Sequence, residues 1–275
     1  MNNFSAPHVK LSNSGPIFHF SHANGYPPLG YRKVLLPFET SYQVVAGLHR
    51  PLWPDTHEPE SMRSWTQLGK DVQNLLADAR DPVISMGHSM GSAAILMAAV
   101  EKPEYFQKII LIEPVLVPRF ATFILGALPS LAMYAWPLAR QTINRVDRWT
   151  TRDAAFEHFR SKGVFRRISD DVLWDYVNSG TGVNKYGEYE LVFSKEWELQ
   201  CYLKVYNCWK LFKLLKVPAL IIRGSESNTL SKKAWNKLKK ISPKSEYIEI
   251  SNSGHLVPFE QPEFLASRII DWVEN

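Results

Sequence analysis

A serine stands between two glycines in the stretch VISMGHSMGSAAILMAA, where an apolar run gives way to small residues. Gly87-His88-Ser89-Met90-Gly91 matches the pattern G-x-S-x-G, in which a nucleophilic serine sits on a sharp turn from a strand into a helix. Glycines suit this turn because side chains there would collide with neighbouring backbone. The Met90 N–H and the helix N-terminus then face negative charge that develops on a substrate. This pattern predicts covalent chemistry at Ser89, against the plainer alternative of a Gly-Ser turn.

Two further stretches complete a resemblance to the α/β-hydrolase family, in its serine esterase and lipase-like branch. FHFSHANGYPP, residues 18–28, is similar to the oxyanion loop of that family, and SNSGHLVPFEQPEFLASRIIDWV near the C-terminus resembles its catalytic histidine loop and last helix. The three motifs occur in the family's order and cover the chain from about residue 16 to its end.

The resemblance implies roles for individual residues. It makes His255 the general base that takes the proton of Ser89. It also implies that the backbone N–H groups of Asn24 and Met90 form the oxyanion hole. Ala23 stands where the family commonly has glycine, so the donor is either Asn24 or its neighbour.

The acid of the triad is less clearly marked. The family usually places an aspartate after the strand that follows its cap, where RGSESNTLS offers Asn228, which cannot hold an imidazolium by charge. Glu226 lies two residues earlier. Glu113 ends the run KIILI, at the position where the related haloalkane dehalogenases carry their catalytic acid. We favour Glu113, because a parallel sheet presents such a residue at its C-terminal edge. Glu226, or a weak or inactive site with Asn228, remain alternatives.

Apolar segments alternate with amphipathic ones along most of the chain, which predicts an α/β fold with a mostly parallel sheet flanked by helices. The strand candidates are PIFHFS from residue 16, YQVVAGL from 42, PVISMG from 82, KIILIE from 108, PALIIRG from 218 and EYIEIS from 246. The helix candidates are 61–79, capped by Ser61, 92–106 and 263–275. We assign residues 1–114 and 214–275 to the hydrolase core and 115–213, with little strand character, to a helical cap insertion.

Composition limits the partners and the compartment. The net charge of +5 comes from basic residues spread along the chain, which does not indicate nucleic acid. The N-terminus lacks a secretory signal, and Cys201 and Cys208, too far apart to bridge on one helix, suggest reduced thiols in a cytoplasmic protein. The sequence carries no metal-site or dinucleotide motif, and the reaction requires no cofactor.

The segment 120–139 is uncharged over 20 positions, the length of a membrane span. Pro129 and Pro137 favour two short helices covering an apolar cavity over an integral span, which leaves room for peripheral contact with a membrane. The apolar residues that predict this pocket are Phe120, Phe123, Ile124, Leu125, Leu128, Leu131, Met133, Tyr134 and Trp136.

The sequence therefore predicts a serine hydrolase that cleaves a small, largely apolar carboxylic ester through an acyl-enzyme. A lactonase, thioesterase or C–C bond hydrolase would use the same groups. A binding protein with a decayed triad is the alternative from another class, supported by Asn228. The segment His49–Pro54 departs from the family's Gly-rich loop and has no assigned role; acyl chain length and oligomeric state are also open.

Overall fold

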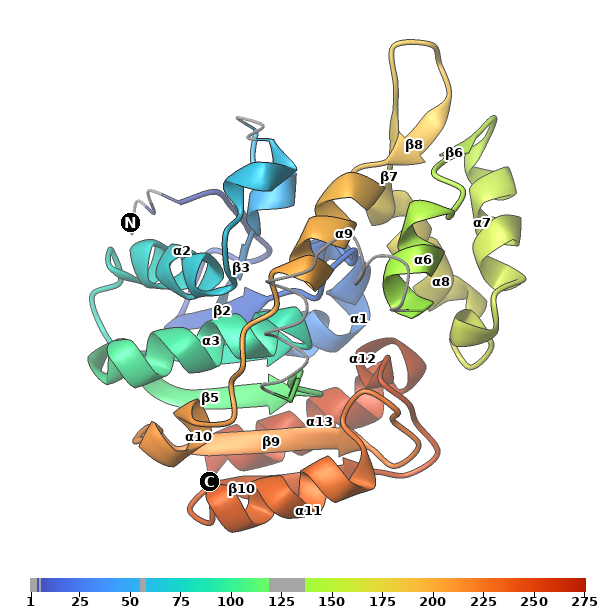
Figure 1. Cartoon of the computed structure of the whole chain (residues 1–275). Helices are drawn as coiled ribbons and strands as arrows, with labels where there is room; N and C mark the ends of the chain where they lie inside the picture. The colour runs from blue at the N-terminus through green and yellow to red at the C-terminus, as the bar shows by residue number, and fades with distance from the viewer. Residues whose placement is uncertain (1–3, 5, 55–57, 119–136) are drawn as a thin grey trace.

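The computed structural model describes residues 4, 6–54, 58–118 and 137–275, and a seven-stranded sheet runs through it (Figure 1). The strands are β1 (His8–Lys10), β2 (Ile17–Ser21), β3 (Gln43–Gly47), β4 (Val83–His88), β5 (Phe106–Ile112), β9 (Ala219–Gly224) and β10 (Glu246–Ile250). Their order is β1-β3-β2-β4-β5-β9-β10, and only β1 pairs antiparallel to its neighbour. The predicted α/β fold with a mostly parallel sheet is confirmed.

Central strands are largely apolar because helices cover both faces of the sheet. Along β5, Ile109 and Leu111 join the hydrophobic cluster on one face, whereas Ile110 and Ile112 join the cluster on the other. This is the period-two alternation of a strand, with both sets of side chains buried.

The flanking helices divide between the two faces. One face is covered by α2 (Thr66–Leu76), α3 (Met90–Glu101), α10 (Leu211–Leu214) and α11 (Lys232–Ile241). The other is covered by α1 (Arg32–Leu35), α12 (Val257–Glu260) and α13 (Pro262–Glu274). Residues of α3 from Met90 to Ala99 are all buried, which explains why its sequence is small and apolar all round.

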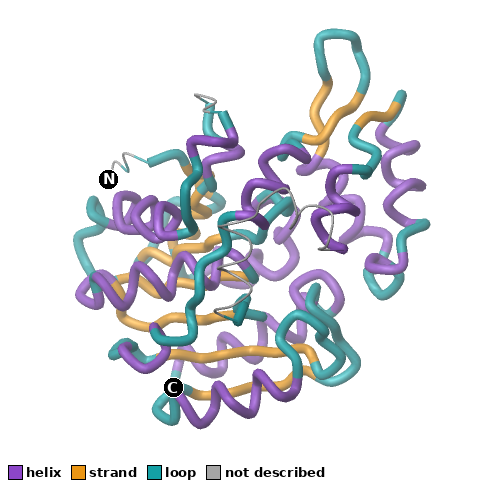
Figure 2. Tube along the Cα trace, in the orientation of Figure 1, coloured by secondary structure: helices purple, strands orange, loops and turns teal. Residues whose placement is uncertain are grey.

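A group of helices with a small sheet lies beside this core, between β5 and β9 in the chain (Figure 2). We call it the helical segment; its helices are α6 (Pro137–Ile143), α7 (Arg152–Arg160), α8 (Asp170–Gly180) and α9 (Lys195–Leu203). Its strands β6 (Arg148–Trp149), β8 (Tyr189–Leu191) and β7 (Thr181–Val183) pair antiparallel. The helical segment contacts the core where α8 packs against the turn Pro28–Tyr31.

All six predicted strands are present, and four details differ from the sequence predictions. The helix predicted over 92–106 is α3, which ends at Glu101, because a 3-10 turn at Pro103–Tyr105 follows and Phe106 begins β5. Helix α2 begins at Thr66, not Ser61, because Pro59–Ser61 forms a separate 3-10 turn. The edge strand β1 and the small sheet of the helical segment were not predicted, since strands of two or three mixed residues carry too short a pattern. Cys201 and Cys208 are buried and free, but α9 ends at Leu203, so one helix does not hold both.

The apolar segment 120–139 falls almost entirely outside the described residues, and so do the nine side chains that predicted an apolar pocket. Within the described part of the chain, no helix has the length and hydropathy needed to cross a bilayer.

Candidate active site

The parallel strands bring the predicted site residues to one edge of the sheet. Ser89 follows β4, Glu113 follows β5, and His255 lies in the loop after β10. Because these strands run in the same direction, their C-terminal ends meet there.

Ser89 occupies a strained turn between β4 and α3. Its backbone has φ 55° and ψ −112°, a conformation that residues other than glycine rarely adopt. A Cβ on Gly91 would lie 2.0 Å from the carbonyl oxygen of Ser21 in β2, and one on Gly87 would lie 2.7 Å from the backbone of Gly91. Both glycines are therefore required for the turn to close, as the sequence pattern predicted.

A hydrogen-bonded relay connects the three side chains. His255 Nε2 is 3.0 Å from Ser89 Oγ, and His255 Nδ1 is 3.0 Å from Glu113 Oε2. Since a carboxylate only accepts, Nδ1 carries the proton and Nε2 is left free to accept the serine proton. The arrangement is that of a nucleophile, a general base and an orienting acid.

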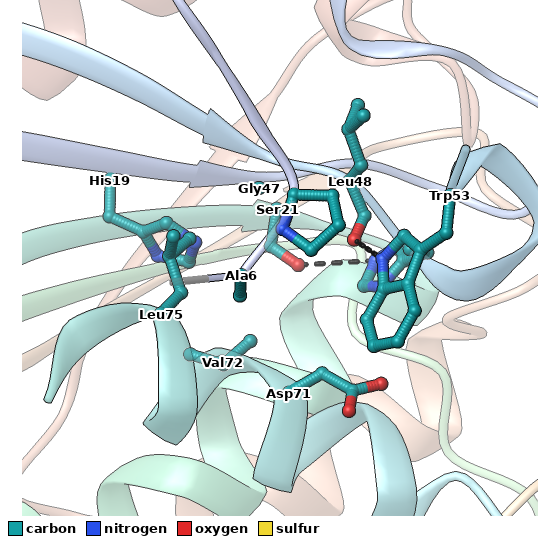
Figure 3. Close-up of a pocket in the computed structure, with 11 residues that line it drawn as sticks. Ala6, His19, Ser21, Gly47, Leu48, Trp53, Asp71, Val72 and Leu75 are labelled. Carbon is teal, nitrogen blue, oxygen red and sulfur yellow. Dashed lines mark hydrogen bonds between the residues drawn. The ribbon is translucent and has the colours of Figure 1, made fainter. Parts of the chain in front are cut away.

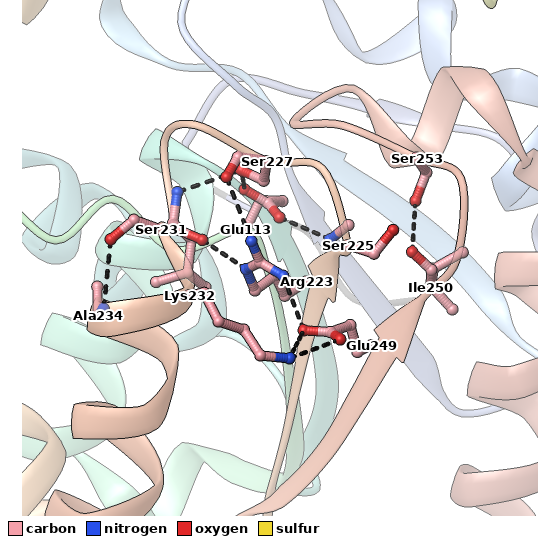
Figure 4. Close-up of polar contacts among 12 residues, drawn as sticks. Glu113, Arg223, Ser225, Ser227, Ser231, Lys232, Ala234, Glu249, Ile250 and Ser253 are labelled. Carbon is pink, nitrogen blue, oxygen red and sulfur yellow. Dashed lines mark hydrogen bonds and ion pairs between the residues drawn. The ribbon is translucent and has the colours of Figure 1, made fainter.

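Glu113 is fully buried and held by more than His255. Its Oε1 accepts from the Gly224 N–H at 2.7 Å, and its Oε2 accepts from Ser227 Oγ at 2.5 Å (Figure 4). Glu113 itself has φ 50°, which turns its side chain off the line of β5. Sequence reasoning missed Ser227 and the Gly224 amide, because nothing local marks partners that lie 114 and 111 residues away.

The two other acid candidates point elsewhere. The Glu226 side chain is 47% exposed and forms an ion pair with Arg167. Asn228 is exposed on a groove of about 320 Å³ that is also lined by His255, with no hydrogen bond between the two. Of the three candidates, the structure brings only Glu113 to His255.

In the oxyanion loop, the Ala23 amide is engaged and the Asn24 amide is not, within the part of the chain that the structure describes. The Ala23 N–H donates to the Tyr31 hydroxyl at 3.2 Å, so it is already engaged. Among the described residues, no acceptor is paired with the Asn24 N–H. The N–H of Met90, first residue of α3, has no acceptor within its own helix. Asn24 and Met90 therefore retain the free donors that an oxyanion hole needs.

His88 connects the three loops of the site, a role that sequence reasoning did not assign. Its Nδ1 accepts from the Tyr31 hydroxyl at 2.8 Å, and its Nε2 donates to the backbone carbonyl of His255 at 2.9 Å. Tyr31 in turn accepts from Ala23, so a continuous chain runs from the oxyanion loop to the histidine loop. Burial, and then the nearby charge of His255, lowers the pKa of His88 well below its usual range, which keeps it neutral.

A second pair of histidines, His22 and His49, holds the oxyanion loop in place through hydrogen bonds. The His49 N–H donates to His22 Nε2 at 3.1 Å, and His49 Nε2 donates to the His22 carbonyl at 3.0 Å. Burial lowers the pKa of His49 to about 4 and that of nearby His19 to about 3. A small cavity of about 10 Å³ lies here, and Figure 3 shows His19, Ser21 and Trp53 in its wall. The segment after β3 thus anchors the loop.

Comparison with known proteins identifies the family. A model of the alpha/beta hydrolase fold family matches residues 67–262. The chain belongs to the α/β-hydrolase family. An uncharacterized hydrolase of Bacillus subtilis, YugF, is 23% identical over 256 residues, covering 89% of this chain and 85% of YugF.

Solved α/β-hydrolase structures show the same fold. E-2-(acetamidomethylene)succinate hydrolase matches with a TM-score of 0.80 and 19% identity, over 98% of this chain and 94% of that one. A thioesterase domain from the curacin biosynthetic pathway matches with a TM-score of 0.77 and 18% identity, over 96% and 94% of the two chains.

Within the described residues, no group of three or more His, Cys, Asp or Glu side chains is arranged to hold a metal ion.

Proposed function

We propose that this α/β-hydrolase is a serine hydrolase that cleaves a carboxylic ester through an acyl-enzyme. The observation that supports this most strongly is the Ser89–His255–Glu113 relay, with both hydrogen bonds formed at 3.0 Å. The buried Glu113 carboxylate accepts three hydrogen bonds, which fix its orientation toward His255. This argues against a decayed triad.

In the first half of the reaction, Ser89 Oγ attacks the acyl carbon while His255 Nε2 takes its proton. The oxygen of the tetrahedral intermediate is stabilised by the N–H groups of Asn24 and Met90. The ester C–O bond then breaks, and His255 returns the proton to the departing alcohol. Glu113 stays ionised throughout and holds the imidazolium by its Nδ1–H.

In the second half, water attacks the acyl-enzyme and His255 accepts its proton. The acid product leaves when the proton passes from His255 to Ser89 Oγ. Ser89 is 8% exposed, so the nucleophile sits below the surface, where hydrogen bonds to the intermediate are stronger than in water.

The segment 115–213 is proposed as the cap over this site, in keeping with the position of the helical segment between β5 and β9. We propose a small, largely apolar substrate, since apolar side chains of the helical segment, such as Phe159 and Phe165, line a cavity described below. The two free, buried cysteines support a cytoplasmic location.

A fluorophosphonate probe tests the reaction class. Such a probe is attacked only by an activated serine, so we expect stoichiometric labelling of the wild type and none of Ser89→Ala. Hydrolysis of 4-nitrophenyl esters from acetate to dodecanoate then defines the preferred acyl length. Absence of labelling in folded wild-type protein would overturn the proposal.

A further inference from the structure

A large cavity lies between the helical segment and the oxyanion loop. Its volume is about 620 Å³, which suits a small-molecule ligand. Its wall combines aromatic and aliphatic side chains with a few polar groups, among them Arg145, Lys162 and Glu198.

This cavity adjoins the oxyanion loop. Tyr26, two residues beyond Asn24, is part of its wall. The Asn24 side-chain amide donates to the Glu198 carbonyl at 3.0 Å, and a Cβ on Gly25 would lie 3.3 Å from the Glu198 carboxyl carbon. The oxyanion loop is therefore in direct contact with Glu198, a residue of the cavity wall.

Arg145 places a positive charge in the cavity wall, and its protein partners do not use all of its N–H donors. It forms an ion pair with Glu198, which is 7% exposed, and also interacts with the Tyr176 hydroxyl. A guanidinium has five N–H donors in a planar fork, and these two partners do not use them all. The remaining donors suit a carboxylate, which accepts in pairs.

The charge of the cavity wall is positive overall. Arg145 and Lys162 are cations, whereas Glu198 is the one carboxylate in the described wall. Lys162 forms no ion pair with any residue that the structure describes. Burial, with the charges of Lys162 and Arg145, lowers the pKa of His158, so this histidine adds no charge at pH 7.

We propose that this cavity is a subsite for a substrate chain that ends in a carboxylate, with Arg145 as its partner and Lys162 supporting it. The substrate is then an ester with an apolar body and an anionic end. The apolar body contacts side chains such as Phe159 and Phe165, and the carboxylate reaches Arg145. This inference rests on the proposed ester hydrolysis and makes its substrate more specific.

Two esters with the same acyl chain test the proposed subsite. The 4-nitrophenyl monoester of adipic acid keeps a free carboxylate, and its methyl-capped form does not. We expect wild-type kcat/KM to be about 10- to 100-fold higher for the free acid, the effect of one charge-assisted hydrogen-bond pair. Added salt should reduce this ratio.

Three variants locate the effect. Arg145→Gln alone leaves the buried Glu198 carboxylate without its ion-pair partner, which destabilises the fold. The double variant Arg145→Gln/Glu198→Gln removes both charges and so leaves no unpaired charge. We expect the double variant to lose the preference, so that its kcat/KM for the free acid equals its own kcat/KM for the capped ester. Lys185→Gln is the matched control, because Lys185 is exposed on the β7–β8 hairpin and outside the cavity wall. A preference that is absent in the wild type, or that survives in the double variant, would refute the subsite.

A binding measurement separates this inference from the proposed reaction. In Ser89→Ala protein, calorimetry with monomethyl adipate and dimethyl adipate compares the charged and neutral ligands without turnover. We expect binding of the monomethyl ester alone, lost in the double variant. Equal binding of both ligands refutes the subsite even if ester hydrolysis is established, and a missing fluorophosphonate reaction refutes the hydrolase while this result stands.

Discussion

The replacement Glu113→Gln examines the role of the buried acid. The three groups that hydrogen-bond to Glu113 are all donors: the Gly224 N–H, the Ser227 hydroxyl and His255 Nδ1–H. A glutamine offers one acceptor oxygen and one NH₂. Whichever way the amide is turned, its NH₂ faces at least one of these donors.

The size of the effect follows from the two orientations. If the NH₂ takes the place of Oε2, His255 must present an unprotonated Nδ1, so its proton moves to Nε2 and the base toward Ser89 is lost. If the NH₂ takes the place of Oε1, it opposes the Gly224 N–H, and the imidazolium still lacks a negative partner. The equivalent exchange in a serine-protease triad lowers kcat about 10⁴-fold, or roughly 5.5 kcal/mol in activation free energy, and we expect a similar loss.

The assay is kcat on a 4-nitrophenyl ester, with thermal unfolding measured in parallel. Glu226→Gln is the matched control, since this glutamate is half-exposed and paired with Arg167. We expect the control to stay within about twofold of wild type, because an exposed ion pair contributes little. A folded Glu113→Gln protein with wild-type turnover, or a 10⁴-fold loss in the control, would show that the acid has been misassigned.

Three further predictions concern the supporting structure. Tyr31→Phe leaves the partners of its hydroxyl unsatisfied, so we expect about 1–3 kcal/mol lower free energy of unfolding and a lower kcat; unchanged values would exclude the His88 chain. The free energy of unfolding should be constant above about pH 7.5, where histidine is neutral in both states, and fall as the pH drops through 6.5, the pKa of His49 in the unfolded chain, toward 4, its pKa in the folded protein. His49 alone contributes roughly 3 kcal/mol to this decline, and His49→Asn should flatten it in urea titrations. A flat wild-type profile would contradict this. Gly91→Ala should prevent folding, whereas Gly163→Ala, with open space around it, should not; circular dichroism distinguishes the two.

The chain's local patterns were sufficient for much of the architecture. Continuous apolar runs predicted the six main strands, because strands covered on both faces need apolar side chains at every position. The serine turn was also predictable from its G-x-S-x-G pattern, although the collision that requires Gly91 is with Ser21 in β2. The histidine loop was found through its resemblance to the family.

Other features depended on contacts between distant segments. Sequence reasoning favoured Glu113 as the acid but left Glu226, or an inactive site with Asn228, as alternatives, because sequence gives no measure of which carboxylate faces His255. The strand order places the end of β5 beside β9, with β10 on the other side of β9, and this arrangement puts Glu113 against a histidine 142 residues away. The Tyr31–His88 chain and the Arg145–Glu198 pair arise in the same way.

The sequence by itself therefore determined which kinds of group are present and on which elements they lie. The tertiary structure decided which of them meet. The physical reason is that apolar periodicity and turn strain are local, whereas hydrogen bonds and ion pairs form only between groups that packing of the sheet and the helical segment has brought within about 3 Å.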